Sequence, residues 1–189
     1  MKKEIRVLGL DDSPFELSDK ECLVIGTFFR GGTILDGVLS TKVAVDGEDA
    51  TAKIISAVNR SKFKPQIQAI FLDGIAVGGF NVINIHALQK YTGLPVIVII
   101  RKKPDFKALE KTLKKLGMEK KYQLMEKAGT PQEVKMKKWK LYIQTAGISM
   151  EKATELLEIC CTHSSIPEAI RAAHLIGAGM VKGESKGKA

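Results

Sequence analysis

Residues 94–100 read Leu-Pro-Val-Ile-Val-Ile-Ile, a run that is apolar throughout and rich in β-branched side chains. Such a run is typical of a strand buried on both faces, as in a parallel sheet covered by helices. A helix-stop signal, Thr92-Gly93, comes before it, and a helix-start signal, Pro104-Asp105, comes after it. The run therefore predicts an α/β fold.

The segments before this run complete one mixed sheet. Residues 67–72 form a second short apolar strand that ends at Asp73, and a helix is expected between the two strands, over 80–91. Further upstream we expect three antiparallel strands at 4–10, 22–29 and 33–45, and then a helix that ends near 59. Three antiparallel strands followed by parallel βα units predict one mixed sheet with helices on both faces.

The segments after the run predict mainly helices. They are expected at 104–116, 119–127, 149–162 and 165–179, with a late edge strand at 139–145. No linker or internal repeat interrupts the pattern. We therefore expect a single domain over residues 1–181, followed by a polar, glycine-rich and flexible tail over 182–189.

Composition narrows the class of protein. The chain has 189 residues, of which 44% are hydrophobic, and this fraction argues against disorder. No apolar run reaches the roughly 20 residues of a membrane span, and the N-terminus lacks the pattern of a signal peptide. Three cysteines, two of them adjacent, form neither a disulfide framework nor a metal-ligand spacing. We expect a cytoplasmic, globular protein without a membrane partner.

The positive charge is concentrated in one segment. The chain has a net charge of +9, and residues 101–140 contain 14 Lys and Arg against 5 Asp and Glu, while the rest is balanced. This segment predicts either a surface that binds a polyanion or a lysine-rich solvated helix. The candidate nucleic-acid-binding residues are Arg101, Lys102, Lys103, Lys138, Trp139, Lys140 and Arg171.

Acidic residues close two of the predicted strands. If the strand over 67–72 pairs with the first strand, Asp11 and Asp73 lie in one crevice at the ends of both strands, where ligands of α/β proteins bind. Carboxylates at such rigid positions suit Mg²⁺ or Mn²⁺. Asp12 and the acidic turn with Asp46, Glu48 and Asp49 are further candidates. The same residues are also common turn formers and helix caps.

One histidine has a partner suited to a phosphate. His174 follows Arg171 by three residues on the last predicted helix, so the two side chains share a face.

Trp139 lies among lysines and has the ring needed to stack on a base, although a lone Trp also serves core packing.

Several segments together resemble endonuclease V, a ribonuclease H-like nuclease. Gly9-Leu10-Asp11 is similar to the metal-binding start of that family, and Phe71-Leu72-Asp73-Gly74 resembles its second acidic strand end. The run Pro95 to Lys102 looks like its next strand, which closes on a basic residue. Segments 148–153 and 166–174 resemble its last two helices, including the active-site histidine.

The closest likeness is to an archaeal family of unknown function allied to endonuclease V. The chain shares with that family Asp46-Gly47, Asp49-Ala50-Thr51, Gly79-Phe80-Asn81 and Gly183-Glu184-Ser185. The resemblance implies that Asp11 and Asp73 are metal ligands and that His174 is a catalytic or phosphate-side histidine. It favours Asp46 and Asp49 over Glu48 as the source of a third ligand.

The chain departs from endonuclease V where that family reads the base. Val43 to Asp46 stand in place of a Pro-Tyr wedge, and Ile75 to Gly79 replace a basic loop that contains a histidine. The resemblance thus implies a Mg²⁺- or Mn²⁺-dependent nuclease, but it does not predict inosine as the substrate. The alternatives are an inactive nucleic-acid-binding module on the same scaffold and a metal hydrolase of small molecules.

Overall fold

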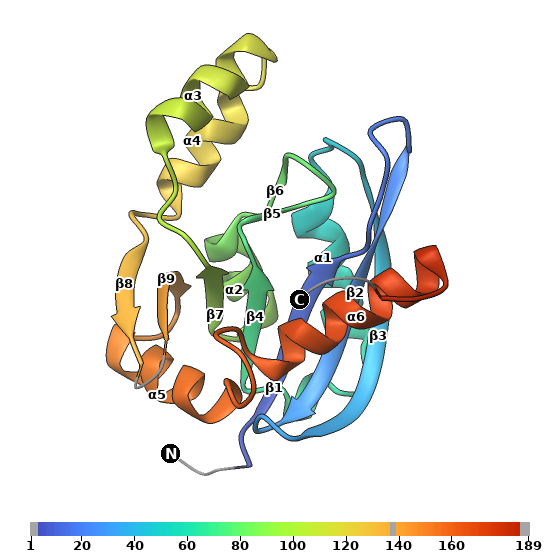
Figure 1. Ribbon diagram of the computed structural model, residues 1–189, viewed down its shortest axis with the longest axis vertical. Helices are drawn as coiled ribbons and strands as arrows, with labels where there is room; N and C mark the ends of the chain where they lie inside the picture. The colour runs from blue at the N-terminus through green and yellow to red at the C-terminus, as the bar shows by residue number, and fades with distance from the viewer. Residues whose placement is uncertain (1–3, 137–138, 186–189) are drawn as a thin grey trace.

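The fold is built on one mixed sheet (Figure 1). The structure is a computed structural model and describes residues 4–136 and 139–185. In spatial order the strands are β3 (Ile34–Ala44), β2 (Glu21–Arg30), β1 (Arg6–Asp12), β4 (Ala69–Asp73), β7 (Val96–Ile100), β9 (Lys140–Ala146) and β8 (Gln132–Lys135).

The strand directions confirm the predicted topology. β1, β2 and β3 form an antiparallel meander, and β4 then pairs parallel to β1. β7 continues the parallel part beside β4, and β9 and β8 are antiparallel. The parallel pairing of β1 with β4 puts the carboxyl ends of both strands at the same edge of the sheet.

Helices cover both faces, as the apolar run predicts. α1 (Ala50–Arg60) and α2 (Ile85–Thr92) pack on one face, and α5 (Met150–Cys160) and α6 (Glu168–Lys182) pack on the other. The central strands supply both cores alternately: Val96 and Val98 of β7 belong to the first core and Ile97 and Ile99 to the second. A strand that is buried in this way needs apolar residues at every position.

The prediction of a helix over 80–91 was partly wrong. A two-stranded ribbon, β5 (Ala76–Val77) and β6 (Asn81–Val82), comes first, and α2 begins only at Ile85. Gly78 and Gly79 have positive φ angles and make the turn of this ribbon. The Asn84 side chain then caps α2 by accepting from the Ala87 amide.

The predicted edge strand over 139–145 has a neighbour that the sequence did not reveal. It corresponds to β9, and β8 lies outside it as the true edge. β8 has four residues, and only Val134 is buried. Such a short strand has too few apolar positions for its alternation to be recognised.

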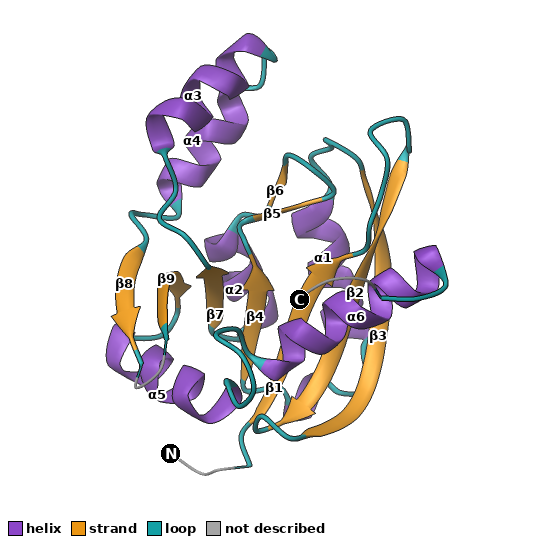
Figure 2. Ribbon diagram, viewed as in Figure 1, coloured by secondary structure: helices purple, strands orange, loops and turns teal. Residues whose placement is uncertain are grey.

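Two helices project away from the sheet. α3 (Phe106–Lys115) and α4 (Glu119–Lys127) form a hairpin between β7 and β8, and Figure 2 shows it extending beyond the edge where β4 and β7 end. Asp105 caps α3 by accepting from the Ala108 amide. Both helices follow the bounds that the sequence predicts to within two residues.

The structure also bears on the membrane, cysteine and tail expectations. Among the described residues, no helix has both the length and the apolar content to cross a bilayer. The three cysteines, Cys22, Cys160 and Cys161, are buried free thiols. α6 continues to Lys182, three residues beyond its predicted end, and the last part of the predicted tail, 186–189, lies outside the described residues.

Candidate active site

Two acidic side chains lie side by side where β1 and β4 end. The parallel register pairs Leu10 with Leu72, so the next residues, Asp11 and Asp73, occupy neighbouring positions at this edge. Asp11 is 4% exposed, because α6 covers it. The structure therefore brings together the two carboxylates that the sequence singled out.

The C-terminal helix lies directly along β1. A Cβ atom on Gly9 would be 2.4 Å from the carbonyl carbon of Ala169 in α6. Two residues further on β1 is Asp11, and five residues further on α6 is His174. These steps cover about 6.6 Å and 7.5 Å, since a strand rises about 3.3 Å and a helix about 1.5 Å per residue. The bare backbone of Gly9 thus allows the approach that puts His174 beside Asp11.

The contact between these two side chains is a hydrogen bond. His174 Nδ1 lies 3.0 Å from Asp11 Oδ2, which leaves the imidazole Nε2 without a partner among the described residues. The Asp12 amide donates to Asp11 Oδ1 over 2.9 Å. Both oxygens of Asp11 are therefore engaged, and the orientation of the carboxylate is fixed.

A cleft of about 610 Å³ opens over these residues. Its charged lining comes from four parts of the chain that are far apart in sequence, and the residues are Asp11, Asp12, Asp73, Arg101 and His174. Arg101 follows β7 and pairs with Asp73, with 2.8 Å between Nη2 and Oδ2. The cleft is thus built at the ends of β1, β4 and β7, with α6 as one wall.

The cleft concentrates negative charge. Burial, followed by the charges of Asp73 and Asp12, raises the pKa of Asp11 to about 8. Burial also raises the pKa of Asp12, although the Gly78 amide donates to its Oδ2 over 2.7 Å. Burial and mutual repulsion disfavour the ionised form of these carboxylates, so a bound cation would stabilise them.

The stability of metal-free protein is expected to fall as the pH rises from about 4 to about 8. In this window the folded chain keeps a proton on Asp11 that the unfolded chain has lost, so deprotonation favours unfolding. Asp11→Asn removes the contribution of Asp11 to this dependence and raises the free energy of unfolding at pH 8 by on the order of 2 kcal/mol. Thermal melts in EDTA at pH 5 and pH 8 measure the difference. A wild-type stability that increases over this range would contradict the assignment.

The cleft suits a hard metal ion in its chemistry. Three carboxylates are the oxygen donors that Mg²⁺ and Mn²⁺ prefer. As the side chains stand, however, no group of three or more Asp, Glu, His or Cys residues is arranged to hold an ion within 4–136 and 139–185. Asp73 is held instead by Arg101, so a metal ion would have to replace that guanidinium.

The acidic turn does not reach the cleft. Asp46 Oδ1 accepts from the Phe80 amide, and Asp49 Oδ1 accepts from the Ala44 amide and from the Asn81 side chain. These bonds tie the turn to the β5–β6 ribbon. Glu48 lines a separate hollow, together with Lys120 and Lys121 of α4. The structure brings none of the three acids of this turn to Asp11 and Asp73.

The candidate nucleic-acid-binding residues divide into two groups. Arg101 lies in the cleft, and Lys102 and Lys103 follow it as exposed side chains. The second group makes contacts within the protein: Lys140 pairs with Glu133, Trp139 packs against the core under α5, and Arg171 pairs with Glu168. Lys138 lies outside the described residues.

The Arg171 pair holds the start of α6. Glu168 is buried, and its Oε2 accepts from Arg171 Nε over 2.7 Å, while Oε1 accepts from the His163 amide. Burial alone would raise the pKa of Glu168, but Arg171 and the His163 amide outweigh it and lower the pKa below its usual value. Arg171 therefore stabilises the helix that carries His174.

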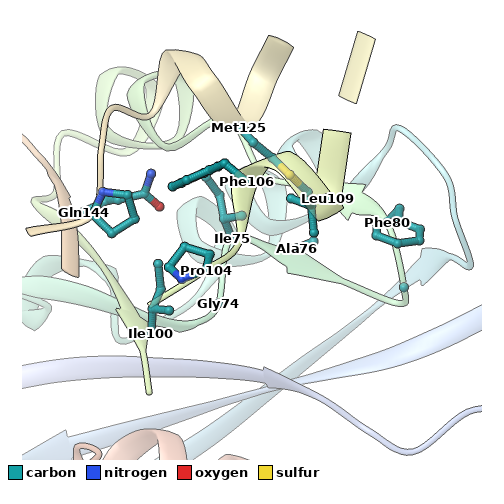
Figure 3. Close-up of a pocket in the computed structure, with 12 residues that line it drawn as sticks. Gly74, Ile75, Ala76, Phe80, Ile100, Pro104, Phe106, Leu109, Met125 and Gln144 are labelled. Carbon is teal, nitrogen blue, oxygen red and sulfur yellow. The ribbon is translucent and has the colours of Figure 1, made fainter. Parts of the chain in front are cut away.

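An apolar pocket of about 300 Å³ adjoins the cleft (Figure 3). The two share Gly74 and Ile100. Phe80 comes from the β5–β6 ribbon, Phe106 and Leu109 come from α3, and Gln144 of β9 lies at one end. The sequence analysis missed this pocket, because its walls come from four segments that only the tertiary fold brings together.

The mixed sheet with helices on both faces has a ribonuclease H-like fold. Human ENDOV has the same fold, with a TM-score of 0.56 and 17% identity over 89% of this chain and 80% of that chain. Ciona intestinalis endonuclease V, in complex with a 24mer DNA containing an inosine followed by a ribo-adenosine, has a TM-score of 0.56 and 16% identity, over 89% and 82%. At these identities the likeness concerns the fold alone.

The chain belongs to the endonuclease dU family, whose model matches residues 3–181. It is 49% identical to a UPF0215 protein of Methanothermobacter thermautotrophicus, over 100% of this chain and 94% of that protein. The crystal structure of a protein of unknown function from Archaeoglobus fulgidus superposes with a TM-score of 0.83 and 37% identity, over 93% and 98% of the two chains. The resemblance to an archaeal family allied to endonuclease V is confirmed.

Proposed function

We propose that this protein is a Mg²⁺- or Mn²⁺-dependent nuclease that cleaves phosphodiester bonds in nucleic acid. The observation that carries the proposal is the cleft, where Asp11, Asp12 and Asp73 lie together with His174 and Arg101. A bound divalent ion would supply an activated water and would stabilise the leaving oxygen. We assign this activity to one ribonuclease H-like domain over residues 1–181.

The protein's own residues have distinct tasks in this proposal. Asp11 and Asp73 would hold the ion on rigid strand ends, and Asp12 would add further oxygen donors. His174 orients Asp11 through Nδ1, and its second nitrogen is available to hold a proton for the phosphate or the leaving group. Arg101, once released from Asp73, binds a phosphate oxygen with its planar guanidinium.

We further propose that the apolar pocket receives the base beside the cleaved bond. The family's description, endonuclease dU, points to deoxyuridine, whose base is uracil. The Gln144 side chain donates to the Gly129 carbonyl, so its Oε1 is left as an acceptor at the end of the pocket. A uracil ring presents one N–H donor on its Watson–Crick edge, which matches this acceptor.

One observation favours the second candidate, a nucleic-acid-binding module without catalysis. The Arg101–Asp73 pair neutralises one proposed metal ligand, and no ready-made set of ligands is found within the described part of the chain. A module of this kind would retain the basic surface and the cleft but would leave the backbone of its ligand intact.

A cleavage panel separates the two functions. End-labelled single- and double-stranded DNA and RNA, unmodified or with one deoxyuridine or inosine, are incubated with the protein in Mg²⁺, Mn²⁺ or EDTA. We expect metal-dependent cleavage next to deoxyuridine. Salt-sensitive binding without cleavage in either metal would identify the module, and a lack of binding at low salt would contradict both functions.

A further inference from the structure

The α3–α4 hairpin has one face that fixes it to the body of the protein. Leu113 and Met125 form a small apolar core with Val82 of β6. The Lys121 ammonium donates to the Asp46 carbonyl, and His86 Nε2 lies 3.0 Å from the Lys127 carbonyl. These contacts hold the hairpin in a defined position relative to the cleft.

The opposite face of α3 carries a row of three lysines, which we call the lysine stripe: Lys107, Lys111 and Lys115. They follow one another at intervals of four residues, so their side chains lie on one side of the helix. At 3.6 residues per turn this side is turned almost half a revolution from Leu109 and Leu113. The stripe therefore faces away from the apolar core.

The charges of the stripe are not neutralised within the protein. All three side chains are exposed, and none forms an ion pair with another residue in the described part of the chain. The neighbouring Lys114, by contrast, pairs with Glu110 over 2.7 Å. Three unpaired lysines on one helix face produce a local positive potential that attracts a polyanion.

Further basic residues lie between the cleft and the stripe. Arg101 follows β7 and lines the cleft, and the exposed Lys102 and Lys103 come next, three residues before the start of α3. The eight residue steps from Lys107 to Lys115 span about 12 Å along the helix axis. Phosphates of one strand of a duplex are spaced by about 3.4 Å along the axis, so the stripe covers about 3.5 of these spacings.

We propose that the lysine stripe binds the phosphate backbone of the nucleic acid beyond the cleft and so extends the contact past the site of cleavage. The inference rests on the proposed function for the identity of the ligand. Lysines that contact phosphates recognise no base. The stripe therefore contributes affinity and register, and the cleft and its pocket carry any selectivity.

The test measures binding in EDTA, where cleavage plays no part. Fluorescence anisotropy with a long labelled duplex compares the wild type with K107Q/K111Q/K115Q over a range of salt concentrations. We expect the triple variant to bind at least about tenfold more weakly, and the slope of log K against log salt to fall by about 2 to 3. The matched control is K53Q/K62Q/K90Q, which removes the same charge from exposed positions on α1, α2 and the segment after α1.

A short duplex that fills only the cleft provides the second comparison. On this ligand the stripe variant should lose no more affinity than the control variant. Equal losses of the two variants on the long duplex would overturn the proposal, and so would a stripe-specific loss of the same size on the short one. Binding of polyglutamate as tight as that of the duplex, with the same dependence on the stripe, would also overturn it, because the surface would then recognise acidic chains in general.

The two proposals fail in different experiments. If the wild type cleaves and the stripe variant binds as tightly as the wild type, the proposal for the stripe is wrong and the proposed nuclease function stands. If binding depends on the stripe but no metal supports cleavage, the proposed nuclease function is wrong and the proposal for the stripe stands.

Discussion

Asp73→Asn is expected to reduce metal-dependent cleavage by at least about 100-fold and to leave the protein folded. Loss of a group that only supports a metal ligand already costs 10- to 100-fold, and Asp73 is proposed as a ligand itself. The amide keeps the size of the carboxylate and still accepts from Arg101, so the local geometry survives. Removal of its charge also lowers the pKa of Asp11, because Asp73 is one of the groups that raise it.

The measurement combines initial cleavage rates in Mn²⁺ with calorimetric titration of Mn²⁺ into the protein. Asp36→Asn is the matched control, since Asp36 lies on β3 and pairs with Arg30 away from the cleft. We expect the control to retain both the rate and the affinity for the metal. If Asp73→Asn kept the wild-type rate, the cleft would not be the catalytic site.

Gly9→Ala is expected to destabilise the fold by about 1–3 kcal/mol and to reduce cleavage as well. The new methyl group would lie 2.4 Å from the Ala169 carbonyl carbon and 2.6 Å from the Ile170 nitrogen, and both are backbone atoms that cannot rotate away. α6 must therefore move off β1. His174 moves with it, and its hydrogen bond to Asp11 is lost.

Urea unfolding gives the change in stability, and single-turnover cleavage of the stably folded fraction gives the change in activity. Gly179→Ala provides the control on the same helix, because a Cβ atom at that position meets nothing within 4 Å. Alanine favours a helix over glycine, so this variant should gain about 0.5–1 kcal/mol. A neutral effect of Gly9→Ala would show that the close packing of α6 on β1 is not required.

The sequence predicted the sheet well because its central strands are extreme in composition. Val96–Ile100 has an apolar residue at every position, which only a strand with two covered faces requires. The β5–β6 ribbon escaped prediction because its conformation depends on tertiary contacts. The Asn81 side chain that anchors it binds Ala44, Asp49 and Ala50, all more than 30 residues away.

The sequence predicted the proximity of side chains that a strand end or a helix face positions. Asp11 and Asp73 follow from strand pairing, and His174 follows from the resemblance to endonuclease V. The sequence did not predict where the Asp46 and Asp49 side chains lie. Both carboxylates accept hydrogen bonds from backbone and side-chain groups that the sequence does not reveal as partners. The role of Arg171 was likewise hidden, because its partner Glu168 becomes buried only when α6 packs.

The contact between His174 and Asp11 joins positions 163 residues apart, and this separation has a consequence for biosynthesis. The ribosome makes β1 first and α6 last, so a nascent chain carries the acidic pair long before it carries the imidazole. Contacts between such distant positions also form late in folding, because a long loop must close first. The cleft can therefore acquire its histidine only after α6 has been made and has packed on β1, so this side of the site is completed late in folding.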